Sequence, residues 1–262
     1  MASAPKTAPL PLFYKDLVPL NTQEHANFKV RSTDKANWLV NTHAVPLTVE
    51  EFPQAQRNYP IVFSATTGGS SVPLALMGMN EGVNVFFDED GTMTTPVYVP
   101  AYARRYPFML ARLSQDKPDL SLCFDPSSEL VGEFDEGRPL FDDGEPSEAC
   151  QQMLKFCENF ENAGGRTQNF IATIEKHELF MNGELTIESD GKPFTYRGFR
   201  MVDENKLREV RGDVLREWNR NGMLALIYAH LFSLELVRDI FGRQVSQGKA
   251  PKSDQATLPT TS

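Results

Sequence analysis

The sequence is poor in cysteine, and the few cysteines present form no pairing pattern. Three of the 262 residues are Cys, at positions 123, 150 and 157. Cys150 and Cys157 are two turns apart on a predicted helix, at roughly 10 Å, which is too far for a disulfide. So few thiols without a paired framework are typical of a reducing compartment. We therefore expect a cytoplasmic protein whose thiols are buried.

The sequence also lacks a long apolar run. The longest uncharged apolar stretch covers residues 222–234, whereas a transmembrane helix needs about 20 apolar residues. Prolines interrupt each short hydrophobic run near the N-terminus, so no secretory signal is predicted. We expect no membrane span.

Basic residues are fewer than acidic residues. The formal net charge is −9, from 26 Lys and Arg against 35 Asp and Glu. A general nucleic-acid binder needs a basic stripe that displaces the counterions of phosphate groups. We therefore expect no nucleic-acid partner.

Common catalytic and cofactor motifs are absent. No G-x-S-x-G, no G-x-G-x-x-G and no phosphate loop ending in Gly-Lys-Ser/Thr occurs. The four histidines show neither H-x-x-x-H nor H-x-D spacing, so we expect no metal site and no cofactor. His43, in a predicted loop, and His230, on an apolar helix, are the candidates for acid–base catalysis. For His230 the alternative is a hydrogen-bonded histidine of the core.

Hydrophobic patterning predicts an α+β fold, with a strand-rich N-terminal half packed against a helix-rich C-terminal half that carries a small β-hairpin. Residues 28–124 form the strand-rich part, residues 125–148 an acidic connector and residues 149–246 the helical part of one region that begins at residue 13. One domain and two subdomains are both compatible with this pattern. Residues 1–12 and 247–262 are rich in small and polar residues and are predicted to be disordered.

Local signals place several boundaries. Thr48 and Glu51 have the spacing of a capping box. A turn at Asp190-Gly191 predicts a hairpin between residues 184–189 and 194–201. Asp203 and Asp213 are predicted helix N-caps.

Glycines are predicted to end two helices. Gly164-Gly165 should stop the helix that begins near residue 149. The last helix should run from Met223 to Phe241, with Gly242 just after its end. Its first half, MLALIYAHLFSL, is apolar on nearly every face, which predicts a central core helix.

Arginine and tyrosine gather in one stretch, YVPAYARRYPFML, at residues 98–110. In a single helical turn there, Tyr102 would share a face with Arg105 and with Tyr106, and together with Arg104 these residues form an Arg/Tyr cluster. Arginines among tyrosines stack as cation–π pairs and hold carboxylates or phosphates through two hydrogen bonds. The cluster is our candidate site for a ligand or partner. The structural alternative is a packed corner in which one arginine pairs with the acidic connector.

Several spaced motifs resemble the SapC family of bacterial proteins. They are VYVPAYARRYPFML at 97–110, LCFD at 122–125, PLFDDGEPSE at 139–148, GFRMVDENKL at 198–207 and NGMLALIYAHLFSL at 221–234. The resemblance covers roughly residues 12–243. It implies an accessory role, because relatives are often encoded beside flavin-dependent tryptophan halogenases and TonB-dependent receptors. It brings no catalytic residues, and the peptide-transporter permease of the same name differs because it spans a membrane.

Three hypotheses of function follow. The first is a non-catalytic accessory protein that binds a partner protein, an anionic peptide or an anionic small molecule through the Arg/Tyr cluster. The second is an enzyme acting on a peptide or amino-acid-like substrate, with a histidine as acid–base group and Arg105 holding a substrate carboxylate. The third is a surface-layer component. We favour the first.

Overall fold

The computed structural model describes residues 10–65, 70–112, 120–189, 192–251 and 255–258. It contains several sheets and a helix-rich C-terminal region, so the α+β class is confirmed. The chain divides into two units. The first is made of residues 1–34 and 105–161, and the second of residues 35–104 and 162–262. Neither unit coincides with a sequence half, because each is built from two separate stretches of chain.

The first unit contains short antiparallel sheets. One sheet has the order β1 (Val18–Pro19), β7 (Leu120–Phe124), β6 (Phe108–Arg112). Another has the order β8 (Val131–Gly132), β2 (Lys29–Val30), β9 (Arg138–Pro139). A hairpin joins β10 (Phe141–Asp142) to β11 (Glu145–Pro146), and the 3-10 helix η3 (Pro126–Ser128) follows β7. The acidic connector is therefore ordered and carries strands.

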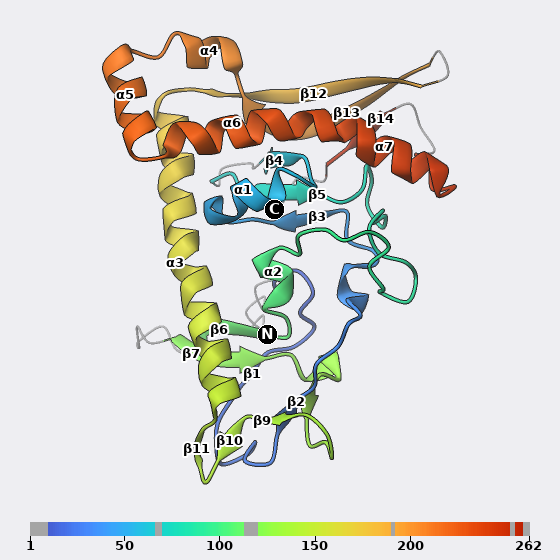
Figure 1. Cartoon of the computed structure of the whole chain (residues 1–262), viewed down its shortest axis with the longest axis vertical. Coiled ribbons are helices and arrows are strands. Elements are labelled where there is room, and N and C mark those ends of the chain that lie inside the picture. The colour runs from blue at the N-terminus through green and yellow to red at the C-terminus, as the bar shows by residue number, and fades with distance from the viewer. Residues whose placement is uncertain (1–9, 66–69, 113–119, 190–191, 252–254, 259–262) are drawn as a thin grey trace, which may run out of the picture. The chain divides into compact units, whose positions relative to one another are not determined.

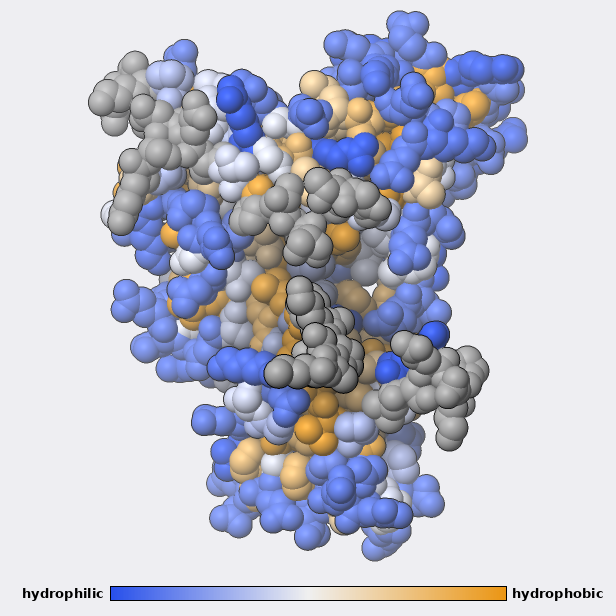
Figure 2. All heavy atoms as spheres, turned by 180° about the vertical axis from the view of Figure 1, so that it is seen from behind, coloured by the Kyte–Doolittle hydropathy of each residue, from blue (hydrophilic) through white to orange (hydrophobic). Residues whose placement is uncertain are grey.

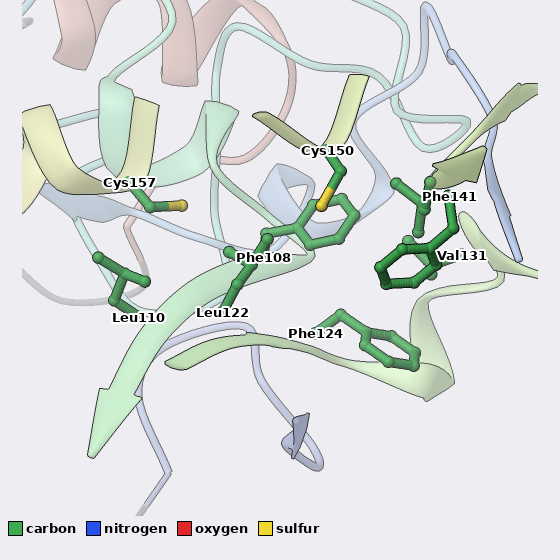
Figure 3. Packing of buried hydrophobic residues seen from close by; sticks show 9 residues of the cluster. Phe108, Leu110, Leu122, Phe124, Val131, Phe141, Cys150 and Cys157 are labelled. Carbon is green, nitrogen blue, oxygen red and sulfur yellow. The ribbon is translucent and has the colours of Figure 1, made fainter. Parts of the chain in front are cut away.

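The core of the first unit lies between β6, β7 and the first part of helix α3 (Glu148–Lys176) (Figure 3). Phe108 of β6 and Phe124 of β7 are almost fully buried there, together with Leu140 of the connector. Cys150 and Cys157 face the same core. All cysteines are buried and free, which agrees with the expectation for the thiols. Cys150 and Cys157 are two helical turns apart, which places both on this apolar face of α3.

The second unit is built on a sheet whose order is β12-β13-β4-β5-β3. The strands are β12 (Phe180–Ser189), β13 (Lys192–Val202), β4 (Ile61–Ser64), β5 (Pro73–Leu76) and β3 (Ala44–Pro46), and β14 (Gln255–Thr257) pairs with β13 in parallel. The predicted hairpin is present as β12 and β13, which are longer than expected. They join a sheet with strands from the N-terminal half.

The second unit also contains helices. They are η1 (Asn37–Leu39), η2 (Val49–Glu51), α1 (Phe52–Ala55), α2 (Ala101–Arg104), the rest of α3, α4 (Glu204–Arg208), α5 (Gly212–Arg220), α6 (Met223–Ser233), η4 (Leu234–Leu236) and α7 (Val237–Ser246). Figure 1 shows α6 and α7 nearly end to end along the sheet, and α6 contacts β4 and β13. Among the described residues, no helix is both long and apolar enough to cross a membrane.

Several local predictions are confirmed and others are wrong. Thr48 and Glu51 form the capping box, and Asp203 caps α4. Helix α3 continues through Gly164-Gly165, because the favourable packing of its buried face outweighs about 1 kcal/mol per helical glycine. Gly242 lies inside α7 and not after its end.

The C-terminal tail differs from the disorder expected of it. Its described part includes β14, and Leu258 is buried and donates its backbone N–H to the carbonyl of Arg197. Gly198 permits this close approach: its φ is +85°, and a Cβ there would lie 2.5 Å from Cγ2 of Thr257. Most of the N-terminal segment predicted to be disordered, residues 1–9, lies outside the described residues.

Candidate functional site

The boundary between the two units divides the Arg/Tyr cluster. Tyr102 and Arg104 belong to the second unit, and Arg105 and Tyr106 to the first. The predicted helical turn is present as α2. Tyr102 and Arg105 are buried, Tyr106 is partly exposed and Arg104 is exposed.

Arg104 is held at the surface of the second unit by its neighbours. Its Nε donates to the carbonyl of Val99 at 3.0 Å, and its Nη2 donates to the Tyr98 hydroxyl at 3.2 Å. The same hydroxyl donates to Oε1 of the buried Glu51 at 2.9 Å. Burial, followed by the charge of Glu51, raises the pKa of Tyr98 to about 12. Glu51 also accepts from the Ala101 backbone N–H at 2.6 Å, so one carboxylate positions both the start of α2 and the tyrosine under Arg104.

Arg105 is enclosed in the first unit. It is 4% exposed, and its Nη1 lies 3.4 Å from Oε1 of Glu161 on α3. Its guanidinium carbon lies 4.4 Å from the ring centroid of Phe160 and 6.0 Å from that of Tyr14. Arg105 therefore does not point outward, and an acid and two aromatic rings of its own unit contact it. Its acidic partner comes from α3 and not from the connector.

Tyr106 packs on other aromatic residues of the first unit. Its ring meets those of Phe13 and Tyr14 edge-on, with centroids 6.1 and 5.3 Å apart. Burial, with a contribution from the charge of Asp125, raises its pKa to about 12. Tyr106 is therefore a neutral hydrogen-bonding group at neutral pH. A role of the cluster in ligand binding stays a prediction.

His230 is a core histidine. It is 0% exposed; its Nδ1 lies 2.7 Å from the carbonyl oxygen of Ile61, and its Nε2 lies 3.1 Å from the backbone nitrogen of Val202. The carbonyl must accept, so Nδ1 carries the proton and Nε2 accepts from Val202. Burial lowers its pKa to about 4. Both ring nitrogens thus join α6 to β4 and β13, and neither is available to a substrate.

His43 lies just before β3. Its carbonyl accepts from the Met77 backbone N–H at 2.7 Å, and burial lowers the pKa of its ring, against the charge of Glu81. Its Nε2 has no hydrogen-bond partner within the described residues. The described part of the chain holds no group of three or more His, Cys, Asp and Glu that suits a metal ion.

A groove of about 810 Å³ lies in the second unit, between the end of α3 and the helices α4 and α5. The β12–β13 hairpin brings α4 back to the end of α3, and the buried Leu207 anchors α4. The Trp218 ring of α5 meets the His177 ring edge-on, with centroids 5.0 Å apart. Val210 and Val214 provide an apolar part of the lining. Figure 2 shows mostly hydrophilic residues at the corner formed by α4 and α5.

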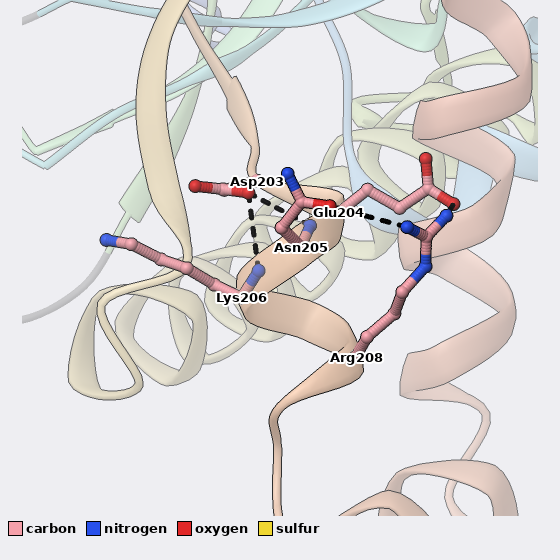
Figure 4. A network of polar contacts seen from close by, with 5 residues as sticks. All are labelled: Asp203, Glu204, Asn205, Lys206 and Arg208. Atoms are coloured by element: carbon pink, nitrogen blue, oxygen red, sulfur yellow. Dashed lines mark hydrogen bonds and ion pairs between the residues drawn. The ribbon is translucent and has the colours of Figure 1, made fainter.

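Three cations line this groove: Lys206, Arg208 and Arg211. Asp203 organises α4, since its Oδ1 accepts the backbone N–H groups of Asn205 and Lys206 at 3.0 and 3.3 Å (Figure 4). Asp213, which was predicted to be an N-cap, is instead inside α5 and accepts two hydrogen bonds from Arg211, each 3.1 Å long.

The three cations differ in their counter-charges. Arg208 pairs with Glu204 at 2.7 Å, and Arg211 with Asp213, in pairs whose arginine side chains are 64% and 82% exposed. Lys206 donates to the backbone carbonyl of Glu178 at 2.8 Å and has no carboxylate within ion-pair distance among the described residues. Exposed pairs are worth about 0–1 kcal/mol, so an incoming anion can replace them. Glu178 and Glu209 also line the groove, so it is mixed in charge and not purely basic.

The model of the SapC family matches residues 20–240. The chain belongs to the SapC family. The match includes the Arg/Tyr cluster, the core of the first unit and the whole groove, so these are parts of the SapC region. No curated protein and no solved structure matches the chain.

The groove residues of this SapC chain were missed at the sequence level. The charges of DENKLREVRGD, residues 203–213, are visible in the sequence, and part of this stretch is among the motifs that resemble SapC. His177 is far from it in sequence and reaches it only because β12 and β13 pair along their length. The one sequence signal for this site was the charged run that follows the predicted cap at Asp203. A charged run alone does not predict a groove, because the groove also needs His177 and Glu178 from the end of α3.

Proposed function

We propose that this SapC-family chain is a non-catalytic accessory protein that binds an anionic ligand, most simply an acidic segment of a peptide or of a partner protein. We place the contact in the groove of α4 and α5, with Lys206, Arg208 and Arg211 facing the carboxylates of the ligand. The observation that carries this proposal is Lys206, a cation at a groove without a carboxylate partner among the described residues.

The chemistry of the groove supports an acidic segment. Guanidinium groups hold carboxylates through two hydrogen bonds, and an ammonium adds a third charge-assisted contact. Val210 and Val214 offer an apolar surface for a neighbouring side chain of the ligand.

The histidine-based enzyme has less support. His230 has both ring nitrogens in hydrogen bonds inside the core, which leaves His43 as the remaining acid–base candidate. Arg105, which that hypothesis assigned to a substrate carboxylate, is paired with Glu161. We therefore retain binding as the function.

The proposal is tested with a fluorescein-labelled hexaglutamate peptide and a hexalysine peptide as the reverse-charge probe. Fluorescence anisotropy should show saturable binding of hexaglutamate only, and weaker binding as salt screens the charges. Lys206→Gln should weaken it roughly tenfold, the equivalent of one charge-assisted hydrogen bond of about 1.4 kcal/mol. Lys155→Gln is the matched control, because Lys155 is an exposed lysine of α3 in the first unit.

The same titration separates the two candidate positions. Arg104→Ala should leave hexaglutamate binding unchanged if the groove is the site. Loss of binding in Arg104→Ala, with Lys206→Gln unaffected, would move the site to the Arg/Tyr cluster. Failure of hexaglutamate to bind at all would overturn the proposal.

A further inference from the structure

Helix α6 has an exposed apolar face, although its composition predicts a central core helix. Met223, Ile227 and His230 are buried against the rest of the second unit. On the opposite face, Tyr228 is 37% exposed and Phe232 is 69% exposed. Large aromatic side chains displayed in this way cost free energy in a lone molecule and mark surfaces that meet another one.

The exposed residues follow the helix as a stripe. Five of them, Ala225, Tyr228, Phe232, Glu235 and Asp239, recur at intervals of three or four residues along α6, η4 and α7. This is the spacing of the contact seam of a coiled coil. Helices α6 and α7 are nearly end to end (Figure 1), so the stripe has a length of about 20 Å at 1.5 Å per residue.

The centre of the stripe is aromatic. The rings of Tyr228 and Phe232 are stacked, with centroids 5.6 Å apart and planes 25° from parallel. Leu224 and Leu231 flank them and are partly exposed. Aromatic residues at the centre of a surface, with leucines around them, have the composition of an interface core.

The two ends of the stripe carry opposite charge. Arg216 and Arg220 precede α6, and Glu235 and Asp239 follow its last turn; with Glu217 and Arg238 included, the ends remain +1 and −1. Among the described residues, none of these side chains takes part in an ion pair. A parallel neighbour would bring like charges together, whereas an antiparallel copy brings each basic end to an acidic end.

We propose that a second copy of this chain docks on this stripe, with the two α6 helices antiparallel about a twofold axis. Tyr228 of one copy then lies against Phe232 of the other, and Arg220 of one copy lies near Asp239 of the other. The same patch serves both copies, as a twofold interface requires. The proposal is independent of the anion groove, which is formed by other residues.

Sedimentation equilibrium and light scattering over a range of protein concentrations, up to about 200 μM, test the interface. The intact chain should dimerise. Phe232→Ser should raise the dimer dissociation constant about tenfold or more, as for a residue at the centre of an interface. Met181→Ser is the matched control, since Met181 is 41% exposed on β12 and outside the stripe. An intact chain that stays monomeric would overturn the proposal, leaving a different partner for the stripe.

Charge reversal tests the antiparallel geometry with exposed residues, where folding is not at risk. Arg220→Glu and Asp239→Arg should each weaken the homodimer, since each brings like charges together twice. An equimolar mixture of the two variants should associate as tightly as the unaltered chain, because a heterodimer restores an opposite-charge pair at both ends. A mixture that remains as weak as its components would exclude this arrangement.

Discussion

Arginine is buried in one region of the molecule and exposed in another. The two regions are the surroundings of Arg105 and the groove of α4 and α5. Arg105 is inside the first unit, against two aromatic rings and the carboxylate of Glu161. Arg208 and Arg211 are at the surface of the second unit, in exposed pairs with acids of their own helical region. The guanidinium of Arg105 is buried against fixed protein groups, whereas those of Arg208 and Arg211 remain exposed to solvent.

The difference separates charges that support the fold from charges that can bind. A buried guanidinium that loses its partner is left without solvent, so its contacts are expensive to break. An exposed ion pair is only slightly more stable than its two charges solvated separately by water. A ligand can therefore replace one partner of the pair at a small cost in free energy. Local sequence shows the arginines but not this distinction, which depends on what long-range packing places around them.

The largest expected effect is on stability, at Arg105. Arg105→Ala should lower the free energy of unfolding by about 3 kcal/mol, because the side chain is buried and its removal leaves a gap beside Phe160 and Tyr14. Arg104→Ala is the control, one residue away and exposed, with an expected loss of about 0.5 kcal/mol. Urea unfolding of both variants measures the difference. Equal losses would mean that the buried and exposed arginines are not distinct.

The second effect is a pH dependence from His230, another interior polar group. Its pKa is about 4 in the folded chain, against an ordinary value of 6.5. Above pH 6.5 it is neutral in both states and adds no pH dependence. Between pH 6.5 and 4 only the unfolded chain takes up the proton, so stability falls as the pH falls, by about 3 kcal/mol in total.

Urea unfolding at several pH values between 7.5 and 4.5 checks this sign and window. His230→Gln should remove the contribution of this residue to the slope, whatever it does to stability at pH 7.5. Ser233→Ala is the control, because the Ser233 hydroxyl donates to the His230 carbonyl and accepts from the Ile61 backbone, yet has no charge to titrate. The slope of His230→Gln matching that of Ser233→Ala would contradict the assignment.

Much of the local structure was predictable, because its causes are local. The helical turn of α2, the capping box at Thr48 and the N-cap at Asp203 each depend on residues within a few positions of one another. The wrong predictions have distant causes. Gly164-Gly165 is inside α3 because residues such as Ala163 and Phe170 on the helix are buried by other parts of the fold.

The candidate sites show the same limit of local reasoning. The sequence places Tyr102, Arg104, Arg105 and Tyr106 together, but burial and the boundary between the units divide them. The apolar composition of α6 predicts burial on all sides, whereas the sheet covers one face and leaves Phe232 exposed. The division of the cluster and the exposure of Phe232 both depend on which strands pair with one another. Pairing between strands that are distant in the sequence cannot be predicted from any one segment.

The smallest expected effect on stability is at the groove, and it completes the comparison. Replacing Arg208 and Arg211 together by Gln should change the free energy of unfolding by about 0.5 kcal/mol or less, because both pairs are exposed. Hexaglutamate affinity should nevertheless fall at least as far as in Lys206→Gln. Combined urea unfolding and anisotropy measure both quantities on one sample. A loss of stability close to that of Arg105→Ala would show that these arginines hold the fold, and the groove would then have no charges to offer a ligand.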